Sequence, residues 1–150
     1  MSTLKRTNSD DLDFQKLVIE LDKVLAVLDG DDHSFYAQYN KLNAIKHVVV
    51  LYKNDKPVGC GAIKEYDEHT MEVKRMFVDP TQRGKGLATA VLLELEKWAK
   101  ELGYKKCILE TGKKQTDAVR LYEKNNYLLM ENYGQYAGVE YSLCFEKKLF

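Results

Sequence analysis

One run of residues, from Met76 to Ala88, constrains the fold more than any other part of the sequence. It reads as the end of an apolar strand, a turn marked by proline, a glycine loop and the start of a long helix. Backbone N–H groups in the first turn of a helix lack partners inside it, and the helix dipole adds partial positive charge there. Gly84 and Gly86 let a ligand approach those groups. Arg83 and Lys85 add full charges, so the run predicts a site for an anion such as a phosphate or pyrophosphate.

Two common phosphate-binding motifs do not fit this loop. A P-loop requires Lys-Ser or Lys-Thr directly after its last glycine, and neither dipeptide follows a glycine in this sequence. A dinucleotide fingerprint requires Gly-x-Gly-x-x-Gly or Ala, and counting from Gly84 the last position holds Thr89. The spacing therefore disfavours a nucleotide-binding or dinucleotide-binding protein.

A third pattern, Arg/Gln-x-x-Gly-x-Gly/Ala, does fit, with Arg83, Gly86 and Ala88 at its defined positions. Downstream, Gln115 opens the run Gln-Thr-Asp-Ala-Val-Arg-Leu-Tyr-Glu-Lys-Asn-Asn-Tyr. Together these segments resemble the GNAT superfamily of N-acetyltransferases, where the first is the acyl-CoA loop and the second commonly reads Asn-x-x-Ala-x-x-Leu-Tyr-x-Lys-x-Gly-Phe/Tyr. Gln115 and Asn126 depart mildly from that pattern. Glutamine keeps the amide of the usual Asn, and Asn tolerates the left-handed conformation of the usual Gly.

Apolar periodicity and turn residues predict the order β-α-α-β-β-β-α-β-α-β-β. We expect strands at residues 3–7, 48–52, 58–66, 71–78, 104–110, 127–130 and 139–145, and helices at 10–28, 34–43, 84–102 and 115–124. Ser9 is the expected N-cap of the first helix, and Gly103 suits the position just past the third. The order is that of the GNAT superfamily. The expected fold is therefore α/β (α+β), one domain over residues 1–150, with a mixed, mostly antiparallel sheet of about seven strands and helices on both faces.

The overall charge gives no argument for nucleic acid or an anionic membrane as a partner, because 23 basic and 23 acidic side chains cancel. No long apolar stretch and no signal-peptide segment is visible, so the expected location is the cytoplasm. Cys60, Cys107 and Cys144 lie far apart in strand-like runs, and we expect buried thiols. Cysteines and histidines do not cluster, and no metal is expected.

The resemblance implies acetyl-CoA as co-substrate and N-acetyltransferase activity. In the superfamily the strand before the loop splays from its parallel neighbour and leaves unpaired backbone groups. The backbone of Phe77 and Val78 is then expected to hold the pantetheine arm, with one N–H polarising the thioester oxygen. Gln115 would contact the arm from the facing helix. The pyrophosphate would lie on the loop formed by Arg83, Gly84, Lys85, Gly86, Leu87 and Ala88.

Acetylation of an amine requires a proton to leave the acceptor and another to reach the departing thiolate. An alkylammonium with a pKa of about 10 is almost fully protonated near neutral pH, and its deprotonation costs about 4 kcal/mol. The resemblance makes Tyr122 the candidate general acid, although it also fits the buried stripe of a short helix. Glu72 is the candidate base, with Glu110 as a second candidate. Either carboxylate could instead pair with Lys74 or Arg75, and ordered water could replace a dedicated base.

The acceptor is the least constrained part of the site. In this fold its pocket is built by the first two helices, their connecting loop and the closing strands. Those segments offer carboxylates and tyrosines that could hold a cationic amine or could equally be caps and core residues: Asp29, Asp31, Asp32, Tyr36, Tyr39, Tyr133, Tyr136 and Tyr141. Compact size and analogy favour a small-molecule amine over a peptide or protein. A longer acyl donor, a non-catalytic acyl-CoA sensor and a homodimer all stay compatible with the sequence.

Overall fold

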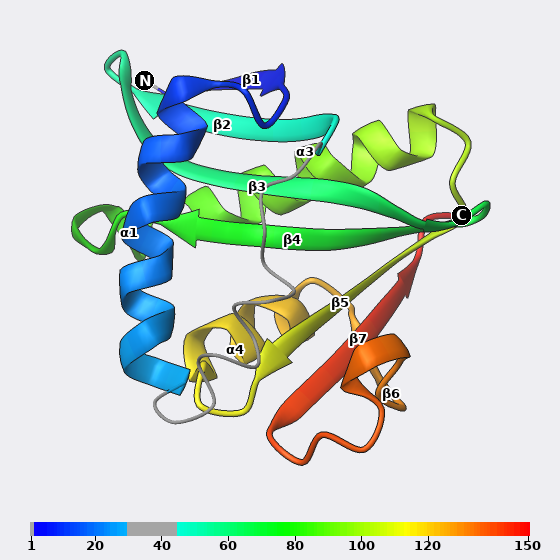
Figure 1. The fold of residues 1–150 in the computed structure, drawn as a ribbon. Coiled ribbons are helices and arrows are strands. Elements are labelled where there is room, and N and C mark those ends of the chain that lie inside the picture. Colours follow the sequence, from blue (N-terminus) through cyan, green and yellow to red (C-terminus); the bar gives the residue numbers. More distant parts are fainter. Residues whose placement is uncertain (1, 30–44) are drawn as a thin grey trace.

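In a computed structural model, which describes residues 2–29 and 45–150, the strands form one mixed sheet in the order β1-β2-β3-β4-β5-β7-β6 (Figure 1). The strands are β1 (Ser2–Thr7), β2 (His47–Lys53), β3 (Lys56–Asp67), β4 (Thr70–Val78), β5 (Lys106–Gly112), β6 (Leu128–Met130) and β7 (Ser142–Lys148). The helices are α1 (Leu12–Asp29), α3 (Leu87–Glu101) and α4 (Thr116–Lys124), with 3-10 turns η2 (Pro80–Gln82) and η3 (Gly134–Tyr136).

Neighbouring strands pair antiparallel except for β4 and β5, which are parallel and are connected through α3. Helix α1 covers one face of the sheet, and α3 and α4 lie on the other (Figure 1). This arrangement confirms the predicted fold class. The helix expected at 34–43 falls outside the described residues.

Both faces of the sheet are buried, which explains the uninterrupted apolar run of β2. Val48 and Val50 pack with Phe14 and Val18 of α1. The alternate residues Val49 and Leu51 pack on the other face with α3 side chains such as Leu95. A strand with two covered faces cannot show the polar alternation of a half-exposed one.

The central feature of the sheet is a splay between β4 and β5. The two strands pair only from Thr70–Lys106 to Glu72–Ile108, and β4 then continues to Val78 without β5 beside it. The register of β4 against β3 shifts at the same place, between the partners of Cys60 and Ala62. The splay expected from the resemblance is therefore present, and it leaves one edge of β4 without a strand partner.

A bulge accompanies the splay. Gly61 stands opposite two residues of β4, and one of them, Arg75, has a left-handed φ of 60°. A Cβ atom on Gly61 would lie 2.5 Å from the Met76 sulfur and 2.8 Å from a Leu95 methyl. Glycine at this position therefore lets Met76 and α3 pack against the bulged strand.

Helix α1 begins at Leu12 rather than at residue 10, and the prediction of Ser9 as its N-cap is wrong. The Asp11 carboxylate accepts the N–H groups of Asp13 and Phe14 at 2.9 and 3.1 Å. The Ser9 N–H instead donates to the Ile45 carbonyl at 3.0 Å, so a contact distant in sequence holds Ser9 outside the helix.

Several other boundaries also shift. Helix α3 begins at Leu87 rather than at residue 84, because Gly84 and Gly86 both have left-handed φ angles. Strand β5 runs from 106 to 112, β6 begins at 128, and β7 begins at 142 because the Ser142 N–H closes a turn on the Val139 carbonyl. Gly103 follows the C-cap of α3 with a φ of 94°, as predicted. Cys60, Cys107 and Cys144 are buried free thiols, also as predicted.

Replacing Asp11 should separate helix capping from ion pairing. Asp11→Ala removes both the cap and the 2.7 Å ion pair with Lys5, and should lower the free energy of unfolding by about 1–2 kcal/mol. Asp11→Asn keeps an acceptor oxygen and should cost less than about 1 kcal/mol, because Lys5 is half exposed and such pairs contribute little. Urea unfolding measures both. Equal losses in the two variants would contradict the capping role.

Candidate active site

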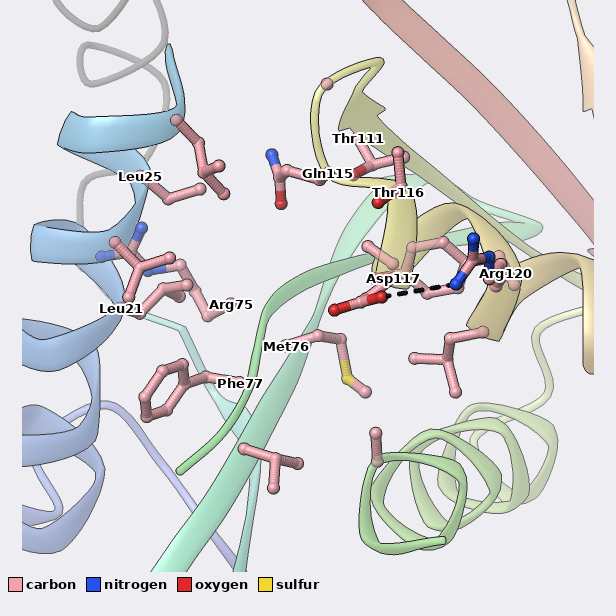
Figure 2. A pocket seen from close by; sticks show the side chains of 18 of the residues that line it. Leu21, Leu25, Arg75, Met76, Phe77, Thr111, Gln115, Thr116, Asp117 and Arg120 are labelled. Atoms are coloured by element: carbon pink, nitrogen blue, oxygen red, sulfur yellow. Dashed lines mark ion pairs between the residues drawn. The ribbon is translucent and has the colours of Figure 1, made fainter. Parts of the chain in front are cut away.

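A cleft of about 1000 Å³ opens where β4 and β5 diverge. Its walls come from α1, the splayed part of β4, the loop before α3, the end of β5 and the first turns of α4. Figure 2 shows Leu21 and Leu25 of α1 on one side and Gln115, Thr116 and Asp117 on the other, with β4 between them. The lining includes these residues singled out from the sequence: Glu72, Phe77, Val78, Arg83, Gly84, Gly86, Leu87, Ala88, Glu110, Gln115, Tyr122 and Tyr136.

The glycine loop places the N-terminus of α3 at this cleft, where the backbone N–H groups of the first turn have no hydrogen-bond partners inside the helix. Gly84 and Gly86 have φ angles of 81° and 75°, and a Cβ at either position would meet no atom within 4 Å. The Ala90 N–H donates to the Gly86 carbonyl at 3.1 Å, which leaves the N–H groups of the preceding first turn outside the helical ladder. Open space, free N–H groups and the helix dipole together suit an anion.

The two cations of the loop differ in their placement. Arg83 lines the cleft, and its Nε donates to the Val78 carbonyl at 3.3 Å. Lys85 does not line the cleft, and its ammonium donates to the Gln82 side chain at 3.3 Å. Arg83 is therefore placed to contact an anion with its side chain, whereas the Lys85 side chain lies against the η2 turn.

The splayed edge of β4 carries a backbone donor at Val78. The Asp79 N–H donates to the Val58 carbonyl of the β3 side at 2.8 Å. Because backbone groups alternate along a strand, the N–H of Val78 points to the opposite edge, as does its carbonyl, which accepts from Arg83. Of the two residues expected to hold the thioester, Val78 is thus the one whose N–H faces the cleft.

Tyr122 is both a core residue and a lining residue. Its ring packs against Tyr127 and Phe145, with centroids 5.8 and 6.2 Å away. Burial raises the pKa of the Tyr122 phenol, and the charge of Glu110 raises it further. Both effects favour the protonated phenol, so Tyr122 keeps its proton at neutral pH and can donate it.

Glu72 is a buried carboxylate with two partners. Its Oε2 accepts the Tyr133 hydroxyl at 2.6 Å, and its Oε1 lies 3.6 Å from the Lys74 ammonium. Burial, followed by the charge of Glu72, raises the pKa of Tyr133, which therefore stays a hydrogen-bond donor. Glu72 thus reaches the cleft in a fixed orientation and does pair with Lys74, as the sequence allowed.

The tyrosines expected at the acceptor pocket take three different positions. Tyr136 lines the cleft, Tyr133 lies behind Glu72, and Tyr141 is 48% exposed and lies under the Lys114 ammonium, outside the cleft lining. The expectations for Asp31, Asp32, Tyr36 and Tyr39, and for the side chain of Asp29, fall outside the described part of the chain.

The first helix was expected to form part of the pocket, but sequence reasoning did not single out its lining residues or the placement of Arg75. Leu21 and Leu25 line the cleft, although their three- and four-residue spacing indicated only a buried helix face. Arg75 also lines it, through a bulge that depends on packing around Gly61 and has no local sequence signal.

Within residues 2–29 and 45–150, no group of three or more His, Cys, Asp or Glu side chains is arranged to hold a metal ion. In the same ranges, no helix is long and apolar enough to cross a membrane.

Comparison with known proteins gives matches over most of the chain. Residues 16–127 match the Acetyltransferase (GNAT) family. An IAA acetyltransferase of Azospirillum brasilense is 37% identical over 102 residues, which cover 67% of this chain and 67% of that protein.

Solved structures extend the likeness to the whole fold. A proposed acyl-CoA N-acyltransferase from Klebsiella pneumoniae is 30% identical, with a TM-score of 0.84 over 100% of this chain and 99% of that one. The yncA protein of Salmonella typhimurium, solved with its cofactor acetyl-CoA, is 15% identical, with a TM-score of 0.70 over 100% of this chain and 95% of that one. The second likeness is one of fold alone.

A charged side chain at Gly86 should abolish CoA binding. Gly86→Glu places a carboxylate in the open space beside the first turn of α3, where it repels a pyrophosphate, and we expect a loss of CoA affinity of at least about 100-fold in calorimetry. Gly103→Glu is the matched control, because Gly103 also has a left-handed φ and open surroundings but lies outside the cleft lining. Both variants should lose about 1–2 kcal/mol of stability. Unchanged CoA affinity in Gly86→Glu would contradict the loop assignment.

Proposed function

The chain belongs to the GNAT acetyltransferase family, and from that premise we propose that it moves an acetyl group from acetyl-CoA directly to the primary amine of a small molecule. Acyl-CoA-dependent N-acetyltransferase activity is the property of the family. The observation that carries the finer proposal is that one cleft joins the α3 N-terminus, the open edge of β4 and the buried phenol of Tyr122.

The donor would lie across the cleft from the glycine loop to the splay. The N–H groups of residues 84–88 and the guanidinium of Arg83 would hold the pyrophosphate. The exposed edge of β4 and the side chain of Gln115 would hold the pantetheine arm. The Val78 N–H would donate to the thioester oxygen, where negative charge develops as the amine attacks.

Tyr122 would supply the proton for the leaving group. When the amine nitrogen bonds to the carbonyl carbon and the carbon–sulfur bond breaks, the electron pair of that bond goes to sulfur. A thiolate has a conjugate-acid pKa of about 8.5, below that of a phenol, so the Tyr122 hydroxyl would first donate a hydrogen bond to the departing sulfur. Its proton would move to sulfur only as the carbon–sulfur bond breaks and negative charge collects there. Burial and the charge of Glu110 raise the pKa of Tyr122 and so keep it neutral until that moment.

Glu72 would accept the proton that the amine loses. Its carboxylate is held by Tyr133 and Lys74, so it keeps one orientation toward the cleft. Glu110 lines the same cleft and is the second candidate. A carboxylate near a cationic amine also favours binding of the acceptor before its proton is removed.

Replacing Tyr122 by Phe should separate catalysis from packing. Tyr122→Phe keeps the ring contacts with Tyr127 and Phe145 but removes the proton donor, so kcat should fall by about 10²-fold or more while CoA affinity changes less than about threefold. The assay is free-thiol release from acetyl-CoA with a panel of amines, amino acids, polyamines and peptides, and with a control lacking acceptor. Thiol release at the wild-type rate would return Tyr122 to a purely structural role.

The two carboxylates can be told apart by matched amides. Glu72→Gln should lower kcat by at least about 10-fold, because the amide cannot take a proton, whereas Glu110→Gln should lower it by less than about threefold. The same thiol-release assay measures both. The reverse order of effects would assign the base to Glu110, and two small effects would point to ordered water instead.

A further inference from the structure

Arg75 is a buried cation with unused hydrogen-bond donors in the wall of the cleft. Its side chain is only 2% exposed, and its Nη2 atom lies 3.0 Å from a carboxylate oxygen of Asp22 on α1. The Nε and Nη1 atoms are fully buried and have no hydrogen-bond partner among the described residues. Burying guanidinium N–H groups without partners is costly, so a structure that keeps them needs a compensating interaction.

The position of Arg75 is also conformationally costly. Its φ of 60° is left-handed, a conformation that costs an arginine about 1–2 kcal/mol. The bulge turns the side chain from β4 toward α1, where Leu21 and Leu25 line the same cleft (Figure 2). Strain of this kind persists where the surrounding structure enforces it, and it gathers at ligand sites.

We propose that Arg75 binds a carboxylate of the acceptor, so that the amine substrate is an amino acid or another small carboxylate-bearing primary amine. This inference rests on the proposed function, since it names the substrate class for the same site. A guanidinium carries five N–H bonds, and Asp22 contacts one nitrogen. The guanidinium has two edges with parallel N–H bonds, one formed by Nε and Nη2 and the other by Nη1 and Nη2. Asp22 can occupy only one of the two N–H bonds of Nη2, so one complete edge stays available for a carboxylate.

The other charges near Arg75 are consistent with this role. Lys74, the neighbouring cation of β4, is paired with Glu72. The Asp22 side chain is 51% exposed, so its carboxylate can leave Arg75 and be solvated by water at a small cost in free energy. Asp22 can therefore neutralise the charge of Arg75 when no ligand is present and give way to a ligand carboxylate. A carboxylate entering the cleft would therefore meet a cation whose present partner is easily exchanged.

The rest of the wall suggests how the acceptor is oriented. Leu21 and Leu25 give the α1 side of the cleft an apolar surface, which suits a short hydrocarbon body. Glu72 precedes Arg75 by three residues and Val78 follows it by three, so each lies about 10 Å along the strand from Arg75. A carboxylate bound to Arg75 would leave the amine free to face Glu72 and the thioester position.

Calorimetry with acid and amide pairs tests the proposal. The probes are L-leucine against L-leucinamide and 4-aminobutyrate against 4-aminobutanamide, each titrated into the protein loaded with CoA, which places the carboxylate at two distances from the amine. The acid of at least one pair should bind at least 10-fold more tightly than its amide. Equal or weaker binding of both acids would overturn the proposal.

Three variants assign the effect to Arg75. Arg75→Met keeps an apolar stem and should bring the acid-to-amide ratio close to one, with CoA affinity as the check that the fold is intact. Asp22→Asn removes the competing carboxylate and should tighten acid binding by a few fold. Lys23→Met, which removes an exposed cation of the same cleft, should change the ratio less than about twofold. If Asp22→Asn weakens acid binding as much as Arg75→Met does, the pair is purely structural.

Acetyl transfer measured on the same pairs keeps the two proposals separate. Tight binding of an acid without thiol release would contradict the proposed transfer reaction but retain the carboxylate site. Thiol release that is equally fast with acids and amides would retain the transfer reaction and overturn the role of Arg75.

Discussion

The early end of pairing between β4 and β5 is the constraint on which the site depends. Parallel strands joined through a helix ordinarily stay paired, and their backbone groups then satisfy each other. Here the pairing stops at Glu72 and Ile108, while β4 runs on to Val78. The open edge would be costly in a closed core, so its backbone groups need hydrogen-bond partners other than β5. The cleft, the Val78 donor and the access to Tyr122 all follow from this separation.

The same separation places Arg75 where it both belongs to a bulge of β4 and lines the cleft. The bulge at Arg75 sets β4 out of register with β3, and Gly61 makes room for it beneath α3. It also sends a guanidinium toward α1 and divides the cleft into two regions. The side of α3 and α4 carries the proposed anion site and the proposed proton donor Tyr122, and the side of α1 carries Arg75 beside Leu21 and Leu25. A reaction that joins an anionic donor to a small acceptor needs such a division.

Local signals in the sequence were sufficient for most of the fold and for the position of the glycine loop before α3. Gly103 and Asn126 take the left-handed conformations expected of them, because a turn or helix end is decided by neighbouring residues. Contacts between distant residues decided the rest. Ser9 and Asp11 are both favourable N-cap residues for α1. The hydrogen bond from the Ser9 N–H to the Ile45 carbonyl is what keeps Ser9 out of the N-cap position. Lys85 stays a predicted anion ligand, and its ammonium donates to the Gln82 side chain, a contact that the sequence did not indicate. Arg75 depends on packing around Gly61, and no local pattern signals it.

The central claim is that the splay is the binding site for the reactive end of the donor, and a crystal structure of the protein with CoA tests it most directly. The account predicts the pyrophosphate on residues 84–88, the pantetheine arm along the open edge of β4, and the sulfur between the Val78 N–H and the Tyr122 hydroxyl. CoA bound with its sulfur outside the splay, or β5 closed onto β4 in the complex, would contradict it.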